Sequence, residues 1–128
     1  MPRNMSFALT TDQIRDRTKT VTRRDGWLKA KPGDRVRPVL KCMGLKKGEC
    51  VTPILPSGWL IEFTSVRRER LEEISQEDVV REGFPVMSPV EFCVMYRKHG
   101  DRADDGKVAR IEFRYVEVND GLPEVSTT

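Results

Sequence analysis

Three segments with the pattern of β-strands constrain the fold of this chain most strongly. They alternate apolar with polar residues, or are rich in β-branched and aromatic types, as strands with one buried face are. In chain order they are residues 34–43 (DRVRPVLKCM), 58–68 (GWLIEFTSVRR) and 107–118 (KVARIEFRYVEV). The last is the clearest, because its large apolar residues point mostly to one face: Val108, Ile111, Phe113 and Tyr115. We therefore expect the chain to be built around a β-sheet.

Three capping-box patterns predict short helices between these strands. In such a pattern two side chains, three positions apart, satisfy free backbone N–H groups at the start of a helix. The patterns are Thr10 with Gln13, Ser75 with Asp78, and Ser88 with Glu91. The third is the strongest, because Pro89 follows the cap and apolar residues then recur at helical spacing. We expect these apolar residues to pack onto the sheet: Val90, Phe92, Val94, Met95 and Tyr96.

The pattern of elements predicts an α+β fold in one domain. A further strand is expected in KTVTRR, residues 19–24, and a turn in KPGD, residues 31–34, where Gly33 can take a positive φ. About five or six strands with two or three short helices most economically close a small mixed β-barrel with the helices outside, since closure leaves no exposed sheet edge. We assign residues 1–118 to this domain and 119–128, which are short of large hydrophobes, to a flexible tail.

Composition argues against a membrane protein and against a metal site. Hydrophobic residues make up 38% and charged residues 34% of the chain. No apolar run approaches the roughly 18 residues of a membrane span, so we expect a cytoplasmic protein. A zinc site would need all three cysteines, Cys42, Cys50 and Cys93, together with the single histidine, His99. We instead expect reduced, buried cysteines, a solvated His99 at a helix end, and neither a metal nor another cofactor.

Basic residues concentrate in the first part of the chain. Residues 1–50 contain 13 Lys and Arg against 5 Asp and Glu, a net charge of +8, whereas the remainder contains 10 against 15, a net of −5. A partner that carries phosphates selects such a concentration, because each neutralised phosphate releases counterions. The alternative is an ordinary solvated basic face.

The basic part contains the stretch KTVTRRDGW, residues 19–27. Thr20 and Val21 are β-branched and poor in a helix, so the pattern predicts a short strand that carries a polar site. In an extended chain Thr20, Thr22 and Arg24 share one face, and Lys19, Val21 and Arg23 share the other. Lys19 and Thr22 therefore meet only if the chain bends at Thr20.

Four motifs follow one another in order over residues 6–118. They are KTVTRR, the KPGD turn, VVREGF and the helix SPVEFCVMY. In this order and at this length the chain resembles the ASCH domain, a branch of the PUA-like barrel superfamily, and is closest to small phage and bacterial members. The resemblance implies a PUA-like barrel and a link to RNA or nucleosides. PUA-like barrels commonly bind RNA, and one small ASCH branch hydrolyses the acetyl amide of acetylated cytidine with a lysine, a threonine and a glutamate.

The resemblance carries these catalytic residues onto Lys19, Thr22 and Glu82, and an arginine that ends the motif onto Arg24. We expect the three catalytic residues to converge on one cleft. Thr22 would attack the amide or position water, Lys19 would accept its proton or stabilise the oxyanion, and Glu82 would pass a proton to the leaving amine. The alternative is a structural Lys19–Glu82 ion pair. The chain departs from that branch by the added connection GLKKGECVTPILPSGW and by Arg23, which replaces an apolar residue.

Several neighbours of the motif are candidates for ligand binding. Trp27 can stack on a base or belong to the core. The full set is Thr20, Arg23, Arg24, Trp27, Lys29 and Lys31. Three functions remain open: a module that binds RNA, single-stranded DNA, a nucleotide or a nucleoside; an amidohydrolase of an acylated nucleoside; and a metal-independent ribonuclease, as some ASCH members are. The sequence does not fix the oligomeric state.

Overall fold

The described part of the protein has one five-stranded sheet and three α-helices. The computed structural model describes residues 3–40, 51–99 and 106–118. The strands are β1 (Arg3–Ser6), β2 (Val21–Arg24), β3 (Arg35–Val39), β4 (Trp59–Arg70) and β5 (Lys107–Glu117). The helices are α1 (Thr11–Arg15), α2 (Gln76–Arg81) and α3 (Pro89–His99), with short 3-10 helices at Ala8–Thr10 and Leu71–Glu73. The predicted α+β class and all four predicted strands are confirmed, while the expected tail, 119–128, lies outside the described residues.

The sheet is mixed and open. Its strand order is β1-β3-β4-β5-β2, with β1 parallel to β3 and every other pair antiparallel. The predicted closed barrel is therefore wrong for the described part of the chain. The two edge strands, β1 and β2, have four residues each and form no ladder with one another. A side chain links them instead, because Arg24 Nη2 donates a hydrogen bond to Ser6 O at 2.6 Å.

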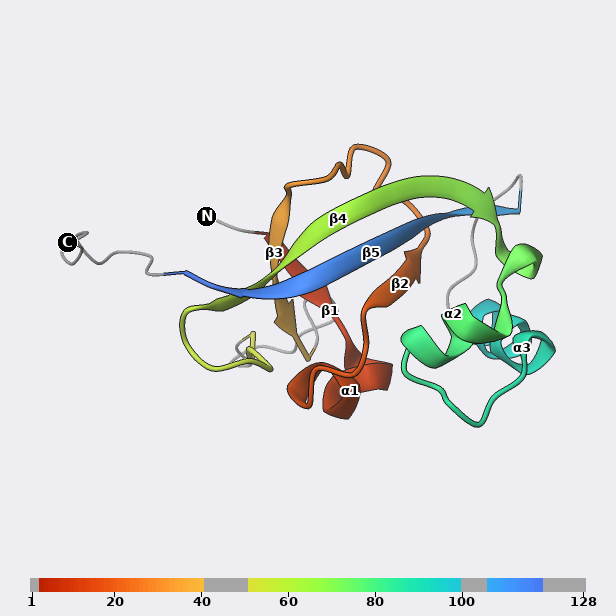
Figure 1. Cartoon of the computed structure of the whole chain (residues 1–128), viewed down its shortest axis with the longest axis horizontal. Coiled ribbons are helices and arrows are strands. Elements are labelled where there is room, and N and C mark those ends of the chain that lie inside the picture. Colours follow the sequence, from red (N-terminus) through yellow and green to blue (C-terminus); the bar gives the residue numbers. More distant parts are fainter. Residues whose placement is uncertain (1–2, 41–50, 100–105, 119–128) are drawn as a thin grey trace, which may run out of the picture.

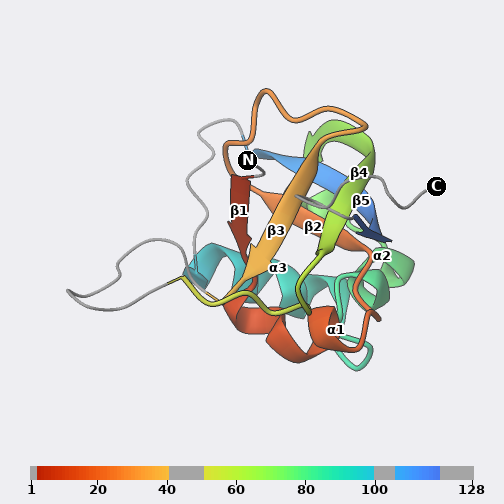
Figure 2. The same cartoon turned by 90° about the vertical axis from the view of Figure 1, so that its left-hand side faces the viewer.

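The longest pairing in the sheet is the antiparallel one between β4 and β5. Figure 1 shows this pair twisting across the whole molecule. The register shifts between Phe63 and Ser65, which is a β-bulge and increases the local twist. In both views the helices gather below the strands, with α2 and α3 together at one end of the pair and α1 nearer its middle (Figures 1 and 2). No helix in the described residues is long and apolar enough to cross a membrane.

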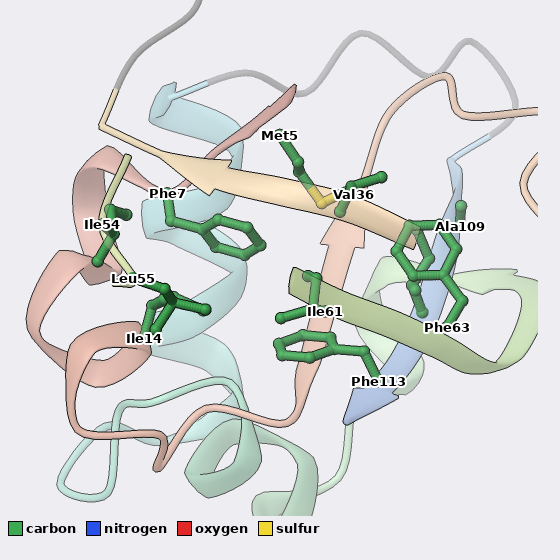
Figure 3. Close-up of a cluster of buried hydrophobic side chains, with 11 residues drawn as sticks. Met5, Phe7, Ile14, Val36, Ile54, Leu55, Ile61, Phe63, Ala109 and Phe113 are labelled. Carbon is green, nitrogen blue, oxygen red and sulfur yellow. The ribbon is translucent and has the colours of Figure 1, made fainter. Parts of the chain in front are cut away.

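Two apolar clusters form the core. The larger lies between the sheet and the segments around α1, where Ile14, Phe63 and Phe113 are among the buried side chains (Figure 3). The smaller joins α2, α3 and the start of β5 through Val79, Phe92 and Val108. The two clusters therefore lie on different faces of β5. Ile111, Phe113 and Tyr115 face the larger cluster and Val108 the smaller, so these residues point mostly to one face, as predicted.

The helix caps form largely as the sequence predicts. Ser75 Oγ accepts a hydrogen bond from Asp78 N at 3.1 Å, and Ser88 and Glu91 form a reciprocal capping box with bonds of 2.8 and 3.1 Å. The cap predicted at Thr10 does not form, because Gln13 Nε2 donates instead to Gly83 O at 2.9 Å.

The apolar stripe predicted for α3 is only partly buried. Phe92 and Cys93 are buried and Met95 and Tyr96 pack against them, but Val90 and Val94 are 73% and 62% exposed. Val90 and Val94 are one helical turn apart, so they share a face, and this face of α3 points away from the sheet. The prediction that they pack onto the sheet is wrong.

The end of α2 has the backbone geometry that places Glu82. Gly83 N donates to Val80 O and Phe84 N to Val79 O, at 2.9 and 3.1 Å, which is a Schellman motif that ends the helix after Glu82. Gly83 has φ +107°, and a Cβ at this position would lie 2.8 Å from Gln13 Cγ. The glycine of REGF is therefore required both by its backbone angle and by the close approach of α1.

We predict that Gly83→Ala destabilises the protein more than Gly33→Ala does. Gly33 has φ +95°, but a Cβ added there would meet no atom within 4 Å, so its substitution costs only backbone strain, about 1 kcal/mol. Gly83→Ala adds a steric conflict with Gln13, worth about 1–3 kcal/mol more. Chemical denaturation of the two variants measures the difference, and equal losses of stability would contradict it.

Candidate functional site

A cavity of about 440 Å³ opens between β2, the end of β1, the segment after α2, and α3. Lys19, Thr22 and Glu82 all line it, although Lys19 and Glu82 are 63 positions apart in the chain. The predicted convergence of these three side chains is confirmed. The chemical roles assigned to them stay predictions.

Lys19 and Glu82 form a buried pair in the cavity wall, and each residue is only 3% exposed. Lys19 Nζ donates to Glu82 Oε1 and to the Glu82 backbone oxygen, both at 2.7 Å. Burial lowers the pKa of Lys19 from its ordinary value, because desolvation disfavours the ammonium more than the attraction of Glu82 favours it. A lysine with a lowered pKa is closer to serving as a base.

The backbone around Lys19 is fixed from three sides. Tyr115 donates from its hydroxyl to Lys19 O at 2.6 Å, and Thr20 N donates to Arg81 O at 2.9 Å. On the third side, Lys19 N donates to Gln13 O at 3.2 Å. Arg17, two positions earlier, has φ +64°. Because β2 begins only at Val21, Lys19 is released from the strand alternation and its side chain turns into the same cavity as Thr22.

Thr22 is 3% exposed, and its hydroxyl is polarised by a neighbouring cation. Arg24 Nε donates to Thr22 Oγ1 at 3.1 Å, while the same guanidinium lies 4.6 Å from the centre of the Phe7 ring. A hydroxyl that accepts one bond can still donate its own hydrogen. Arg24 therefore places a positive charge beside Oγ1, and this bond does not use the hydroxyl's own hydrogen.

Arg23 is an internal cation with three carboxylate partners. Its side chain is 1% exposed. Nη2 lies 2.7 Å from Asp78 Oδ2 and also contacts Glu69 Oε2, and Nη1 lies 3.3 Å from Glu82 Oε2. Burial alone would lower the pKa of Arg23, but the bonds to Asp78 and Glu69 outweigh it and raise the pKa. Arg23 thus holds Glu82 through Oε2, whereas Lys19 contacts Oε1. Because three carboxylates already balance its charge, Arg23 attracts an anionic ligand only weakly.

The other predicted binding residues divide between the cavity and its surroundings. Arg24 and Trp27 line the cavity, and Trp27 also packs edge-on against Phe63 of the core. Thr20, Lys29 and Lys31 do not line it. Thr20 Oγ1 accepts a bond from Arg81 Nε at 3.2 Å, and Lys31 pairs with Asp34 at 2.8 Å within the KPGD turn.

Five polar residues that line the cavity were not predicted as site residues: Ser6, Thr10, Asp25, Tyr96 and His99. Tyr96 donates from its hydroxyl to Asp25 Oδ1 at 2.9 Å. The position of Asp25 directly after KTVTRR is the signal that could have found it. The sequence pattern marks Tyr96 only as an apolar residue of α3, and His99 only as a solvated helix end.

The described residues contain no group of three or more His, Cys, Asp and Glu side chains placed to hold a metal ion. Cys93 is buried and donates to Leu71 O at 3.6 Å, and burial raises the pKa of its thiol. Cys42 and Cys50 lie outside the described residues.

Comparison with known proteins supports the fold alone. No protein-family model and no curated protein matches the chain. A solved structure, the crystal structure of hypothetical protein PH0355, is similar to it with a TM-score of 0.64 and 19% sequence identity, over 91% of this chain and all of the other. At this identity the likeness extends to the arrangement of helices and strands and carries no function.

We predict that Asp78→Asn lowers the free energy of unfolding by about 3–5 kcal/mol at pH 7, because it leaves two buried arginines short of a counter-charge. Burial alone would raise the pKa of Asp78, but hydrogen bonds from Arg110 and Arg23 outweigh it and hold the pKa well below its ordinary value. The stabilisation is therefore complete above the unfolded-state value of about 3.9, and it is lost as the pH falls from there through the lower folded-state value.

Denaturation of the native protein and the variant from pH 7 to pH 2 measures this effect. The native protein should lose stability in acid, and Asp78→Asn should lose less. The exposed Asp12, which pairs with Arg15, provides the control, since Asp12→Asn should change stability by no more than about 0.5 kcal/mol. A small effect of Asp78→Asn, comparable with that control, would contradict the account.

Proposed function

We propose that this chain is an ASCH-domain protein of the PUA-like superfamily, and that its cavity binds an acylated nucleoside and hydrolyses the acyl amide. The ordered motifs KTVTRR, KPGD and REGF support the family assignment. The mixed sheet supports the family assignment too, because its two edge strands lie close enough for one hydrogen bond, from the Arg24 side chain to Ser6 O, to join them. A buried, free Cys93 agrees with the cytoplasmic location that we include in the proposal.

The observation that carries the proposal is the buried Lys19–Glu82 pair at 2.7 Å in the wall of a cavity that Thr22 also lines. Amide hydrolysis needs a nucleophile, a base, a stabiliser of the oxyanion and an acid for the leaving nitrogen. Three side chains of the types used by the acetylcytidine hydrolases are gathered in one place. The lowered pKa of Lys19 gives it the property that a base requires.

The geometry supports the following sequence of steps. Lys19, as the neutral amine, accepts the hydroxyl proton of Thr22 while Oγ1 bonds to the acyl carbon. Arg24 Nε, 3.1 Å from Oγ1, stabilises this oxygen as its proton leaves, and the negative charge passes to the acyl carbonyl oxygen as the O–C bond forms. The proton passes from Lys19 by way of Glu82 to the leaving nitrogen as the C–N bond breaks. Water then attacks the acyl-threonine and gives a proton to Lys19. The C–Oγ1 bond breaks, Lys19 passes that proton to Oγ1, and the carboxylic acid leaves with the Thr22 hydroxyl restored.

The cavity suits a free nucleoside better than a polynucleotide. Its volume of about 440 Å³ lies within the usual range for small-ligand sites, about 300–1,000 Å³. Part of the wall is apolar and aromatic, with Phe7, Phe84 and Phe92, which suits a base. Of the four cations expected to hold phosphates, Arg23 and Arg24 line the cavity and Lys29 and Lys31 do not, and Arg23 is already paired with three carboxylates.

The deciding experiment incubates the purified protein with acetylated cytidine and, separately, with a mixed RNA pool. We expect mass spectrometry to show cytidine and acetate, with the RNA intact. Cleaved RNA would support the ribonuclease hypothesis instead. Nucleoside, RNA or single-stranded DNA that binds without turnover would leave a binding module.

We predict that Thr22→Val abolishes turnover of acetylated cytidine, by at least about a hundredfold in kcat, because it removes the hydroxyl while keeping the shape of the side chain. Thr22→Ser keeps the hydroxyl and should retain measurable activity. Binding of the nucleoside, measured by calorimetry, should be similar in both. Equal rates for the native protein and Thr22→Val would remove Thr22 from the mechanism.

We also predict that kcat/KM rises with pH through one ionisation below the ordinary lysine value of 10.5, since Lys19 acts as the neutral amine and burial lowers its pKa. Lys19→Arg keeps a cation that cannot lose its proton, so it should abolish turnover. Lys29→Arg, an exposed substitution outside the cavity, should leave the profile unchanged. An active Lys19→Arg enzyme would assign Lys19 to charge stabilisation rather than proton transfer.

A further inference from the structure

We propose that the hydroxyl of Thr10 determines specificity in the cavity, by donating a hydrogen bond to an acceptor atom on the pyrimidine ring of the substrate. This inference rests on the proposed function and specifies how the site recognises the base. It assigns a role to a buried hydroxyl that the proposed hydrolytic steps do not use.

Thr10 has a buried hydroxyl that the fold does not use. The residue occupies the N-cap position of α1, but its side chain makes no capping bond. It is only 5% exposed, and within the described ranges of the chain its hydroxyl has no hydrogen-bond partner. A buried hydroxyl without a partner lowers stability, because it gives up its hydrogen bonds to water. A threonine at this position is therefore not explained by the stability of the fold.

The hydroxyl of Thr10 is open to the cavity. Two polar side-chain atoms of the described residues are fully enclosed and lack a hydrogen-bond partner, namely Asn4 Oδ1 and Arg23 Nε. Thr10 Oγ1 also lacks a partner but is not one of these enclosed atoms, so part of its surface is accessible. Thr10 forms part of the cavity wall, and the cavity is the open space beside it. A ligand in the cavity can therefore reach this oxygen.

Thr10 lies at the Phe7 end of the cavity wall. Thr10 N donates to Phe7 O at 3.1 Å, and residues joined by such an i to i+3 bond lie one above the other. The ring of Phe7 lies 4.6 Å from the guanidinium of Arg24, which in turn donates to Thr22 Oγ1. A flat base that packs on Phe7, with its acyl amide at Thr22, therefore brings its ring atoms close to Thr10.

The chemistry of a hydroxyl selects the ring that it recognises. A threonine hydroxyl donates one hydrogen bond, and an acylated aminopyrimidine presents a ring nitrogen and a ring carbonyl oxygen as acceptors on the edge by which proteins read a base. A benzene ring that carries the same acyl amide offers no acceptor. A site that hydrogen-bonds its substrate discriminates against an analogue without the partner atom, because the polar group of the site then stays unpaired. Thr10 thus favours a pyrimidine amide over an aryl amide.

The first test compares the native protein with Thr10→Val and Thr10→Ser in the turnover of acetylated cytidine. Thr10→Val removes the hydroxyl and keeps the shape of the side chain, so KM should rise about three- to tenfold. The value of kcat should change by less than about twofold, since the bond is present in the ground state and the transition state alike. Thr10→Ser keeps the hydroxyl and should keep the native KM.

Thr64→Val is the matched control. It makes the same chemical change at an exposed threonine of β4, whose hydroxyl donates to Glu112 O at 3.1 Å, and it should leave KM unchanged. If the native protein binds acetylated cytidine without turning it over, the dissociation constant from calorimetry replaces KM in the same comparison.

Thermal melting separates this role from a structural one. The Thr10 hydroxyl has no partner within the described protein, so Thr10→Val should leave the melting temperature unchanged or raise it. A lower melting temperature for Thr10→Val, with Thr10→Ser at the native value, would show that the hydroxyl bonds within the fold, and would overturn the inference.

Two smaller probes test the ring acceptor: acetylated cytosine without its sugar, and acetanilide, which carries the same acetyl amide on a benzene ring. Calorimetry with the Thr22→Val protein, which consumes neither, should show at least about threefold tighter binding of acetylated cytosine. Equal binding of the two probes overturns the inference. An unchanged KM in Thr10→Val also overturns it, and turnover by the native protein then leaves the hydrolase standing. Neither binding nor turnover of acetylated cytidine overturns the proposed function and the role of Thr10 with it.

Discussion

The buried guanidinium of Arg23 is the contact on which the rest of the site depends. Arg23 on β2 lies directly opposite Arg110 on β5, which lies opposite Arg67 on β4, so the sheet carries a row of like charges. Like charges opposed across strands are destabilising unless they are compensated. Asp78 of α2 compensates two of them, since it accepts from Arg23 at 2.7 Å and from Arg110 at 2.7 and 3.1 Å. The helix is thereby docked on the sheet by charge as well as by its apolar side chains.

The position of Glu82 follows from that docking. Glu82 is the last residue before the Schellman turn of α2, so fixing the helix brings its carboxylate between Arg23 and Lys19. One network thus has two consequences. It stabilises the contact between helix and sheet, and it buries Lys19 in the cavity wall, where desolvation lowers its pKa. A structural ion pair and a catalytic pair are separate interpretations of the sequence, but this geometry is compatible with both at once.

Local patterns in the sequence predicted four of the five described strands, though not β1, and two of the three caps. The family resemblance, and not local pattern, predicted the meeting of Lys19, Thr22 and Glu82. Features that depend on distant partners were not predictable in this way. Arg23 has the pattern of a surface cation until Asp78, Glu69 and Glu82 are known to face it. The open sheet depends on how far β1 and β2 extend, and alternation does not reveal that length. The Tyr96–Asp25 bond joins residues 71 positions apart, and no local pattern links the helix of Tyr96 to the stretch that contains Asp25.

The most direct test of the account is the pKa of Lys19 itself, followed by NMR titration of its side-chain nitrogen in the free protein. The account predicts a value below the ordinary 10.5 of lysine, because burial outweighs the attraction of Glu82. It further predicts that Glu82→Gln lowers the value again, since the neutral amide removes that attraction. A Lys19 that titrates at or above 10.5 would show that Glu82 dominates, and Lys19 would then be a structural cation and not the base of a hydrolase.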